Sequence, residues 1–297
     1  NNLMTDFLTY SILILISTIL RLFPLKMVQK FGKLFGLILP LLFPSRKKVA
    51  IDNLALCFPD FDDKWKRSVV KGVFKNLGIT LFETLYIPRM KKRLLDRFIS
   101  INNYYLVDEA LRKGNGVFFL SGHISNWEIM AFSYGKIFRR KLNIIVKSQT
   151  NNLVNNKINE FRELCGNRII EIGSSLREIY NIVKDNGIVC FLMDQSANPD
   201  YSVYSNFFGQ NVATFSGPAK MALKFNTELI FAYPIRQKNY NYLIKVDKIL
   251  YDDLIGGATE ENVQKLTDRI NEKLESAIRE NPDQWLWIHR RFKHLKK

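Results

Sequence analysis

A histidine and an acidic residue lie five positions apart in the segment Gly122-His123-Ile-Ser-Asn-Trp-Glu128. A histidine acts as a general base when one ring nitrogen faces the hydroxyl to be deprotonated and a carboxylate holds the other nitrogen. We therefore expect His123 to abstract a proton and Glu128 to orient the ring and stabilise the imidazolium. The amides in the first turn of a helix beginning near Ser125 would donate hydrogen bonds to a developing oxyanion.

The same segment also has a purely structural interpretation. Ser125-Asn-Trp-Glu128 has the pattern of a capping box, in which Glu128 bonds back to the backbone of Ser125. The spacing alone is weak evidence, because three histidines and 28 acidic residues in 297 produce such a pair by chance about three times in ten. The position of the motif is more informative. Gly122 and His123 end an apolar run, which places them at the carboxyl end of a strand, where open α/β sheets bind ligands.

Apolar runs of strand length alternate with segments of helical spacing after about residue 100. These runs are residues 116–121, 142–146, 187–193, 228–233 and 242–246. Continuous apolar strands separated by helices predict a mostly parallel central sheet flanked by helices. Residues 47–85 have helical spacing throughout, with a break at Phe58-Pro59-Asp60 where a new helix is expected to start.

Two apolar stretches precede this pattern. Phe7–Leu20 carries no charge, and Phe31–Phe43 contains only Lys33. Neither reaches the ~20 residues that cross a bilayer squarely, so a tilted or shallow helix followed by an interfacial helix is expected. We therefore predict a helical membrane-anchoring segment over residues 1–45 and an α/β domain over residues 46–297. A buried core helix is the alternative interpretation of Phe7–Leu20.

Basic residues outnumber acidic ones by 44 to 28, which gives a formal net charge of +16. This charge calls for an acidic partner: nucleic acid, an anionic membrane surface or an acidic carrier protein. Basic clusters at 46–48, 89–93 and 290–291 lie near apolar or aromatic stretches, and no zinc knuckle, helix-turn-helix or RNA-binding platform occurs. We expect an anionic membrane surface and no nucleic acid. A non-catalytic basic membrane-binding protein is the alternative from a different class.

The three cysteines, Cys57, Cys165 and Cys190, are too widely spaced for a metal knuckle or a disulfide framework. Cys190 lies inside an apolar run, where a buried and inert thiol is expected. This cysteine usage indicates a cytoplasmic or cytoplasm-facing location. A lipase-type hydrolase is disfavoured, because the Gly-x-Ser-x-Gly nucleophile elbow does not occur.

Further polar and aromatic residues are candidates for substrate contacts. Arg162 lies in a helical stretch and could pair with a phosphate through its planar fork, or be a surface arginine without a partner. Asp194 and Gln195 follow a strand on the ligand side and could position an acceptor; a turn-forming aspartate is the alternative. Trp285 and Trp287 fit either an interfacial belt or a core-packed chain end.

Several ordered motifs together resemble the bacterial lipid A late acyltransferases, the lauroyl and myristoyl transferases of the lysophospholipid acyltransferase superfamily. Residues 122–128 are similar to the catalytic histidine-x4-acid block of that family, and Arg162 with Gly166 is similar to its arginine-x3-glycine element. Asp194-Gln195 resembles the start of a second region, and residues 281–293 resemble the proline-x-glutamine-tryptophan ending. The resemblance extends from about residue 20 to 293, with phenylalanine at 292 where tryptophan is common.

This resemblance implies transfer of a fatty acyl chain from acyl-carrier protein or acyl-coenzyme A to a hydroxyl of a membrane lipid, with a lipid A precursor as the expected acceptor. It implies catalytic roles for His123 and Glu128. Asn126, Arg162, Asp194 and Gln195 are expected to bind substrate. It implies no metal and no cofactor besides the acyl donor, and an inner-membrane location facing the cytoplasm. A phosphatidylinositol mannoside, a lysophospholipid or an aminolipid is the alternative acceptor.

Overall fold

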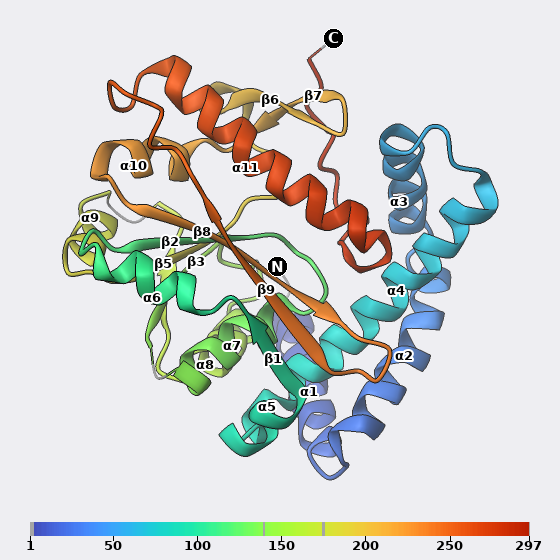
Figure 1. The fold of residues 1–297 in the computed structure, drawn as a ribbon. Coiled ribbons are helices and arrows are strands. Elements are labelled where there is room, and N and C mark those ends of the chain that lie inside the picture. Colours follow the sequence, from blue (N-terminus) through green and yellow to red (C-terminus); the bar gives the residue numbers. More distant parts are fainter. Residues whose placement is uncertain (1–2, 139, 174–175, 297) are drawn as a thin grey trace.

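A seven-stranded sheet forms the centre of the computed structural model, which describes residues 3–138, 140–173 and 176–296. The strand order is β1-β9-β8-β2-β5-β3-β4 (Figure 1). Strands β8 and β9 are antiparallel, and the other neighbouring pairs are parallel. The strands are β1 (Ile99–Asn102), β2 (Val117–Ser121), β3 (Leu142–Val146), β4 (Arg168–Glu171), β5 (Ile188–Leu192), β8 (Glu228–Arg236) and β9 (Tyr242–Ile249). The predicted mostly parallel α/β sheet is confirmed.

Both faces of the sheet are covered, as the continuous apolar character of the central strands requires. In β2, Val117 and Phe119 belong to one buried cluster, whereas Phe118 and Leu120 belong to another on the opposite face. The first face packs against α5 (Lys92–Phe98), α6 (Tyr105–Arg112), α7 (Trp127–Phe138) and α8 (Asn152–Glu163). The second packs against α9 (Leu176–Lys184), α10 (Gly217–Phe225) and α11 (Glu260–Glu280).

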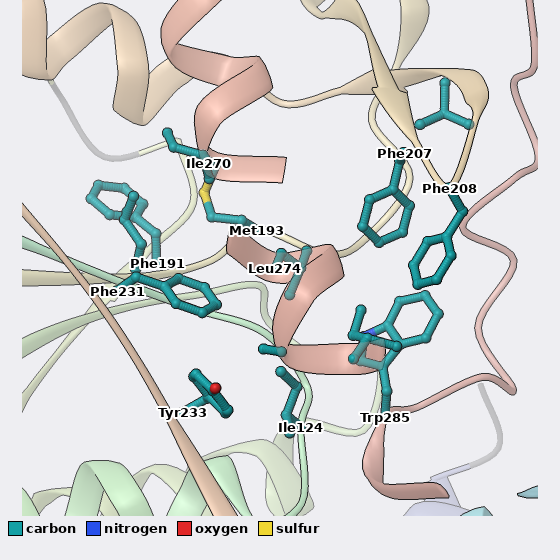
Figure 2. Close-up of a cluster of buried hydrophobic side chains, with 14 of the residues drawn as sticks. Ile124, Phe191, Met193, Phe207, Phe208, Phe231, Tyr233, Ile270, Leu274 and Trp285 are labelled. Carbon is teal, nitrogen blue, oxygen red and sulfur yellow. The ribbon is translucent and has the colours of Figure 1, made fainter. Parts of the chain in front are cut away.

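The second cluster also holds a small hairpin and the end of the chain. Strands β6 (Val203–Phe207) and β7 (Gln210–Thr214) pair antiparallel beside α11. Figure 2 shows Phe207, Phe208 and Trp285 on one side of this cluster and Phe191 and Phe231 on the other. Short 3-10 helices complete the chain at η1 (Ile87–Arg89), η2 (Pro199–Tyr201) and η3 (Pro282–Gln284).

Before η1 and α5, the described chain forms α1 (Leu3–Leu20), α2 (Leu25–Leu42), α3 (Pro44–Cys57) and α4 (Asp63–Tyr86). The predicted break between the last two is confirmed, and Asp62 caps α4 by accepting a hydrogen bond from the amide of Trp65 at 2.6 Å. Helix α1 is long and apolar enough to cross a membrane by length and composition, and only 11% of its residues are buried. Because α1 buries only Ser17 and Leu20, it does not have the buried surface of a core helix.

Helix α2 lies directly against α4, and three glycines permit this approach (Figure 1). A Cβ atom on Gly32 would lie 2.7 Å from the carbonyl oxygen of Gly78, and one on Gly78 would lie 2.2 Å from the carbonyl oxygen of Gly32. A Cβ on Gly36 would meet the carbonyl oxygen of Phe74 at 2.4 Å. Small residues are therefore required where the two backbones touch. The outer side of α2 exposes Leu34, Leu37, Ile38, Leu41 and Leu42.

The five strands expected from the sequence are present as β2, β3, β5, β8 and β9. Three features were not anticipated: the short strands β1 and β4 at the two sheet edges, and the β6–β7 hairpin. Their segments are short and mixed in polarity, so they carry little of the apolar signal that marks a buried strand. The boundary predicted at residue 45 stays a prediction.

Candidate active site

His123 and Asp194 face each other at the carboxyl edge of the sheet. The Nδ1 atom of His123 lies 2.7 Å from Oδ1 of Asp194, and the backbone amide of His123 donates to Oδ2 at 2.6 Å. The strand register explains this meeting: Ser121 at the end of β2 pairs with Leu192 at the end of β5, and each polar residue follows two positions later. Since the carboxylate accepts from Nδ1–H, the Nε2 atom carries the free lone pair and is the basic nitrogen.

The C-terminal segment holds His123 and Asp194 in place. The indole of Trp285 donates to Oδ2 of Asp194 at 2.7 Å, and Trp285 forms an isolated β-bridge with Ile124, which adjoins His123. The amide of Leu286 donates to the carbonyl of His123 at 3.2 Å. Ile124, Leu274 and Trp285 belong to the same buried cluster (Figure 2). Trp285 and Trp287 are 2% and 0% exposed, so the chain end is packed in the core and is not an interfacial belt.

Gly122 makes room for the carboxylate. A Cβ atom at this position would lie 2.7 Å from Cδ1 of Leu274 and 3.1 Å from Oδ2 of Asp194. Any larger residue would push the carboxylate away from the histidine. The glycine before the histidine is therefore required by packing.

Glu128 is not the hydrogen-bonding partner of His123, contrary to expectation. Its carboxylate receives two hydrogen bonds from Arg162, from Nε at 2.8 Å and from Nη2 at 2.5 Å, and a third from the indole of Trp127 at 3.1 Å. The ring of Trp127 lies edge-on to the ring of His123, with centroids 4.7 Å apart. Glu128 therefore acts on the histidine through its charge and through Trp127, while the position beside Nδ1 belongs to Asp194.

Arg162 is not a surface arginine without a partner, and its contact with substrate stays a prediction. Its third nitrogen, Nη1, donates to Asn159 at 2.9 Å, so all three guanidinium nitrogens bond within the protein. The bidentate pair with Glu128 uses the planar fork that the sequence was expected to offer to a phosphate.

Asn126 is buried and bonds within the protein, and its contact with substrate stays a prediction. It is 0% exposed. Its Oδ1 caps α7 by accepting from the amide of Ile129 at 2.9 Å, and its Nδ2 donates to Glu83 at 2.9 Å. The helix start is thus capped by Asn126, and not by a Ser125–Glu128 capping box. Ser125 itself adopts a left-handed conformation with φ of 50°, which turns the chain from the histidine into the helix.

Glu83 was not singled out as a site residue, yet it lies at the centre of a buried polar network. Besides Asn126, it accepts from Tyr242 at 2.6 Å, Gln29 at 2.7 Å and Arg236 at 3.1 Å. The carboxylate is 0% exposed. It connects α2 and α4 to the start of α7, and so ties the N-terminal helices to the loop that carries His123.

A cavity of about 860 Å³ opens in front of His123. Trp127, Glu128, Arg162 and Gln195 line it, and the Nε2 atom of Gln195 lies 3.5 Å from Nε2 of His123. Gln195 therefore lies beside the basic nitrogen, and its contact with substrate stays a prediction. The volume falls within the ~300–1,000 Å³ that is usual for small-ligand sites.

Much of the cavity wall is apolar and comes from both faces of the sheet. Its lining from the first face consists of Phe119, Met130, Ala131, Leu142, Ile144 and Cys190. Ile145, Phe191, Ile179 and Met221 contribute from the second face. Strands β3 and β5 pair over only three residues each, ending at Ile144 and Cys190, so the cavity reaches both faces where their carboxyl ends are no longer paired. Burial raises the pKa of Cys190, which keeps this thiol protonated and unreactive.

Charge coupling sets the protonation of the pair. Burial lowers the pKa of His123, but the charge and hydrogen bond of Asp194 outweigh burial, so the pKa of His123 is raised above its usual 6.5. Burial would raise the pKa of Asp194, yet the His123 charge and the hydrogen bonds from His123 and Trp285 lower it to about 2. The carboxylate is therefore ionised at neutral pH and stabilises an imidazolium. Arg162 likewise holds the pKa of buried Glu128 below its usual value.

The fold and the site define an enzyme with a carboxylate-oriented histidine at the mouth of a largely apolar cavity. The chain belongs to the bacterial lipid A biosynthesis acyltransferase family, whose sequence profile matches residues 2–294. It is 24% identical over 254 residues to the lipid A biosynthesis palmitoleoyltransferase of Escherichia coli K12, covering 84% of this chain and 79% of that protein.

Two further relatives from the same strain agree with this assignment. The lipid A biosynthesis lauroyltransferase is 21% identical over 274 residues, covering 91% of this chain and 86% of that protein. The lipid A biosynthesis myristoyltransferase is 23% identical over 252 residues, covering 82% of this chain and 74% of that protein. These three relatives differ in the acyl group that they are named for, so membership in the family leaves the acyl length open.

Proposed function

We propose that this protein transfers a fatty acyl chain from a thioester donor, acyl-carrier protein or acyl-coenzyme A, to a hydroxyl of a lipid A precursor. The observation that carries the proposal is the His123–Asp194 pair, with His123 lining a cavity whose wall is largely apolar. This geometry suits a reaction that needs a general base next to a bound alkyl chain.

In the proposed reaction, Nε2 of His123 takes the proton of the acceptor hydroxyl while the oxygen attacks the thioester carbonyl. Asp194 holds Nδ1–H and stabilises the imidazolium that forms. The tetrahedral intermediate collapses with cleavage of the carbon–sulfur bond. The imidazolium then returns the proton to the leaving sulfur, which gives an ester and a free thiol. The side-chain amide of Gln195, beside Nε2, is placed to donate a hydrogen bond to the developing oxyanion.

The cavity lining supports an acyl chain as the buried part of the substrate. Side chains such as Phe119, Leu142 and Ile144 offer apolar contacts and few hydrogen bonds, which suits an alkyl chain and excludes a polar group of similar size. The Arg162–Glu128 pair lies at the polar end of the same cavity, near His123. It marks the end at which the carbonyl of the substrate would be positioned.

The N-terminal helices support a membrane location, which we propose to be the inner membrane with the catalytic domain on the cytoplasmic side. Helix α1 exposes Phe7, Leu8, Ile12 and Leu15, and α2 continues this apolar surface. The net charge of +16 favours an anionic headgroup surface next to these helices. A lipid acceptor would then reach the cavity from the bilayer.

Mass spectrometry of lipids from a strain lacking this protein tests the proposal. We expect a lipid A species that lacks one acyl chain, and restoration of that chain by the wild-type protein but not by His123→Ala. Purified protein with acyl-carrier protein and acyl-coenzyme A donors would then identify the donor. An unchanged lipid A together with a change in a phosphatidylinositol mannoside, a lysophospholipid or an aminolipid would replace the proposed acceptor.

A further inference from the structure

The cavity that contains His123 and the apolar side chains is also lined by three lysines, Lys147, Lys220 and Lys224. Lys147 follows the last residue of β3, while Lys220 and Lys224 are one turn apart on α10. All three side chains are exposed. Among the residues that the structure describes, none of the three forms a salt bridge, whereas Lys113, Lys245 and Lys273 all do.

These lysines give the cavity a positive rim that an alkyl chain does not require. The described lining contains two carboxylates, those of Glu128 and Glu171, and Glu171 accepts a hydrogen bond from Ser148 at 2.7 Å. The other nearby charges cancel, because Arg162 is paired with Glu128. With that pair neutral, the remaining charged lining is three lysines and Glu171, and this surplus of positive charge suits a doubly charged anion.

The position of Lys147 after β3 gives its approximate distance from His123. His123 follows β2 and Lys147 follows β3, and β5 lies between these two strands. Two inter-strand spacings amount to roughly 10 Å. An anion bound at Lys147 is therefore several bonds away from the carbonyl or hydroxyl that reacts at His123. The two ends of the cavity would bind different parts of one elongated substrate.

We propose that Lys147, Lys220 and Lys224 form a subsite for a phosphate group of a substrate whose reactive end reaches His123. This inference deepens the proposed function and rests on it. Ammonium groups on flexible stems pair well with phosphate oxygens. Both substrates of the proposed reaction could supply that group: the donor through the phosphopantetheine arm of its thioester, and the acceptor through a phosphorylated sugar.

Kinetics of the purified full-length protein test the subsite and identify the source of the phosphate. The variants are Lys147→Ala, the double variant Lys220→Ala/Lys224→Ala, and their combination. The matched control is Lys64→Ala/Lys238→Ala, which removes two exposed lysines that do not line the cavity. Each variant is assayed with acyl-coenzyme A and with the phosphate-free N-acetylcysteamine thioester of the same acid. It is also assayed with the lipid A precursor before and after removal of its phosphates.

We expect the triple variant to raise KM for one phosphate-bearing substrate by at least about tenfold, with kcat within about twofold of wild type. The KM for the phosphate-free analogue of that substrate should not change, and Lys220→Arg/Lys224→Arg should restore binding. A rise for acyl-coenzyme A assigns the phosphate to the donor, and a rise for the lipid assigns it to the acceptor.

Two results would overturn the subsite. One is a triple variant with the same KM as the Lys64→Ala/Lys238→Ala control for both substrates. The other is an equal rise in KM for the phosphate-free analogues, which would assign the lysines to general packing or surface charge. Either result leaves the proposed function intact as long as the wild type transfers acyl chains. A wild type that transfers none to any acceptor would instead refute the proposed function.

Discussion

The indole of Trp285 donates its N–H to Oδ2 of Asp194 at 2.7 Å, across 91 residues of sequence. The backbone amide of His123 donates to the same oxygen at 2.6 Å, which leaves Oδ1 for the imidazole. The indole of Trp285 and the amide of His123 therefore hold the carboxylate in the orientation in which Oδ1 meets the imidazole. The C-terminal segment thus takes part in positioning the base, although it lies far from the histidine motif in the sequence.

Asp194→Asn should lower kcat by about 10³–10⁴-fold. An amide removes the negative charge that stabilises the imidazolium and can present N–H to Nδ1, which favours the tautomer with the proton on the reacting nitrogen. Glu128→Gln should lower kcat less, because Glu128 bonds to Arg162 and not to the ring. Steady-state assays of both variants, with circular dichroism as a check on folding, measure the difference. Equal losses in the two variants, or a larger loss in Glu128→Gln, would contradict the assignment of Asp194 as the orienting residue.

The pH profile should reflect the raised pKa of His123. The base must be neutral to accept a proton, so kcat/KM should rise with pH through a pKa above 6.5. In Asp194→Asn the residual activity should rise at a lower pH, because the charge that raised the histidine pKa is gone. A rising limb that stays in place in this variant would show that another group titrates.

The two residues of the pair contribute to stability with opposite pH dependences, and only the contribution of Asp194 grows with pH as activity does. Because the pKa of His123 is raised in the folded state, its contribution is complete below 6.5 and is lost as pH rises through the folded-state value. The pKa of Asp194 is lowered from 3.8 to about 2, so its contribution is present above 3.8 and is lost as pH falls toward 2. Stability and activity are therefore expected to diverge above pH 6.5.

The sequence predicted the sheet better than it predicted the hydrogen-bonding partner of His123. Strands β2 and β5 are visible in the sequence as apolar runs. Strand β2 begins after Gly116, and β5 begins after Gly187. Aligning these glycines places His123 opposite Asp194, as the register in the structure does. That alignment is informative only if the two strands are neighbours, which depends on the packing of the whole sheet. Glu128 is the simpler candidate for the partner of His123, because it is close in the sequence. The local motif does not reveal that Glu128 forms an ion pair with Arg162.

The roles of Asn126 and Glu83 were hidden for a similar reason. Whether an asparagine caps a helix or contacts a ligand depends on which atoms it meets after folding. Glu83 lies in the long helix α4, and glutamates in such helices are usually exposed to solvent. It is buried here because α2 and β9 pack against α4 around it. The sequence carries the residue types of this network but not their contacts.

Glu83→Gln should destabilise the fold by about 3–5 kcal/mol, because it leaves the buried guanidinium of Arg236 without its counter-charge. Arg236 is 8% exposed and bonds to Glu83 at 3.1 Å. The matched control is Asp52→Asn, which breaks the exposed pair with Lys48 and should cost at most about 1 kcal/mol. Chemical denaturation of both variants measures the difference. Similar free energies of unfolding in the two variants would argue against a structural role for the buried network.

The exposed apolar face of α1 gives the last prediction, which concerns membrane attachment. Ile12 and Leu15 are 49% and 60% exposed, so Ile12→Asp/Leu15→Asp should leave the fold intact. A charge near the centre of a bilayer costs about 2.5–3.5 kcal/mol, and two charges should release protein from membranes that retain the wild type at high salt. Ile255→Asp, at a residue that is 88% exposed and far from α1 in the sequence, is the matched control and should stay bound.

Sedimentation with anionic vesicles at low and high salt, together with a thermal melt, measures both effects. Buried apolar area is insensitive to screening, so wild-type protein should pellet at both salt concentrations. The double variant should pellet only at low salt, through the basic residues that remain. Loss of cooperative melting in the double variant would instead assign α1 to the protein core, and wild-type protein in the supernatant at either salt concentration would refute the anchor.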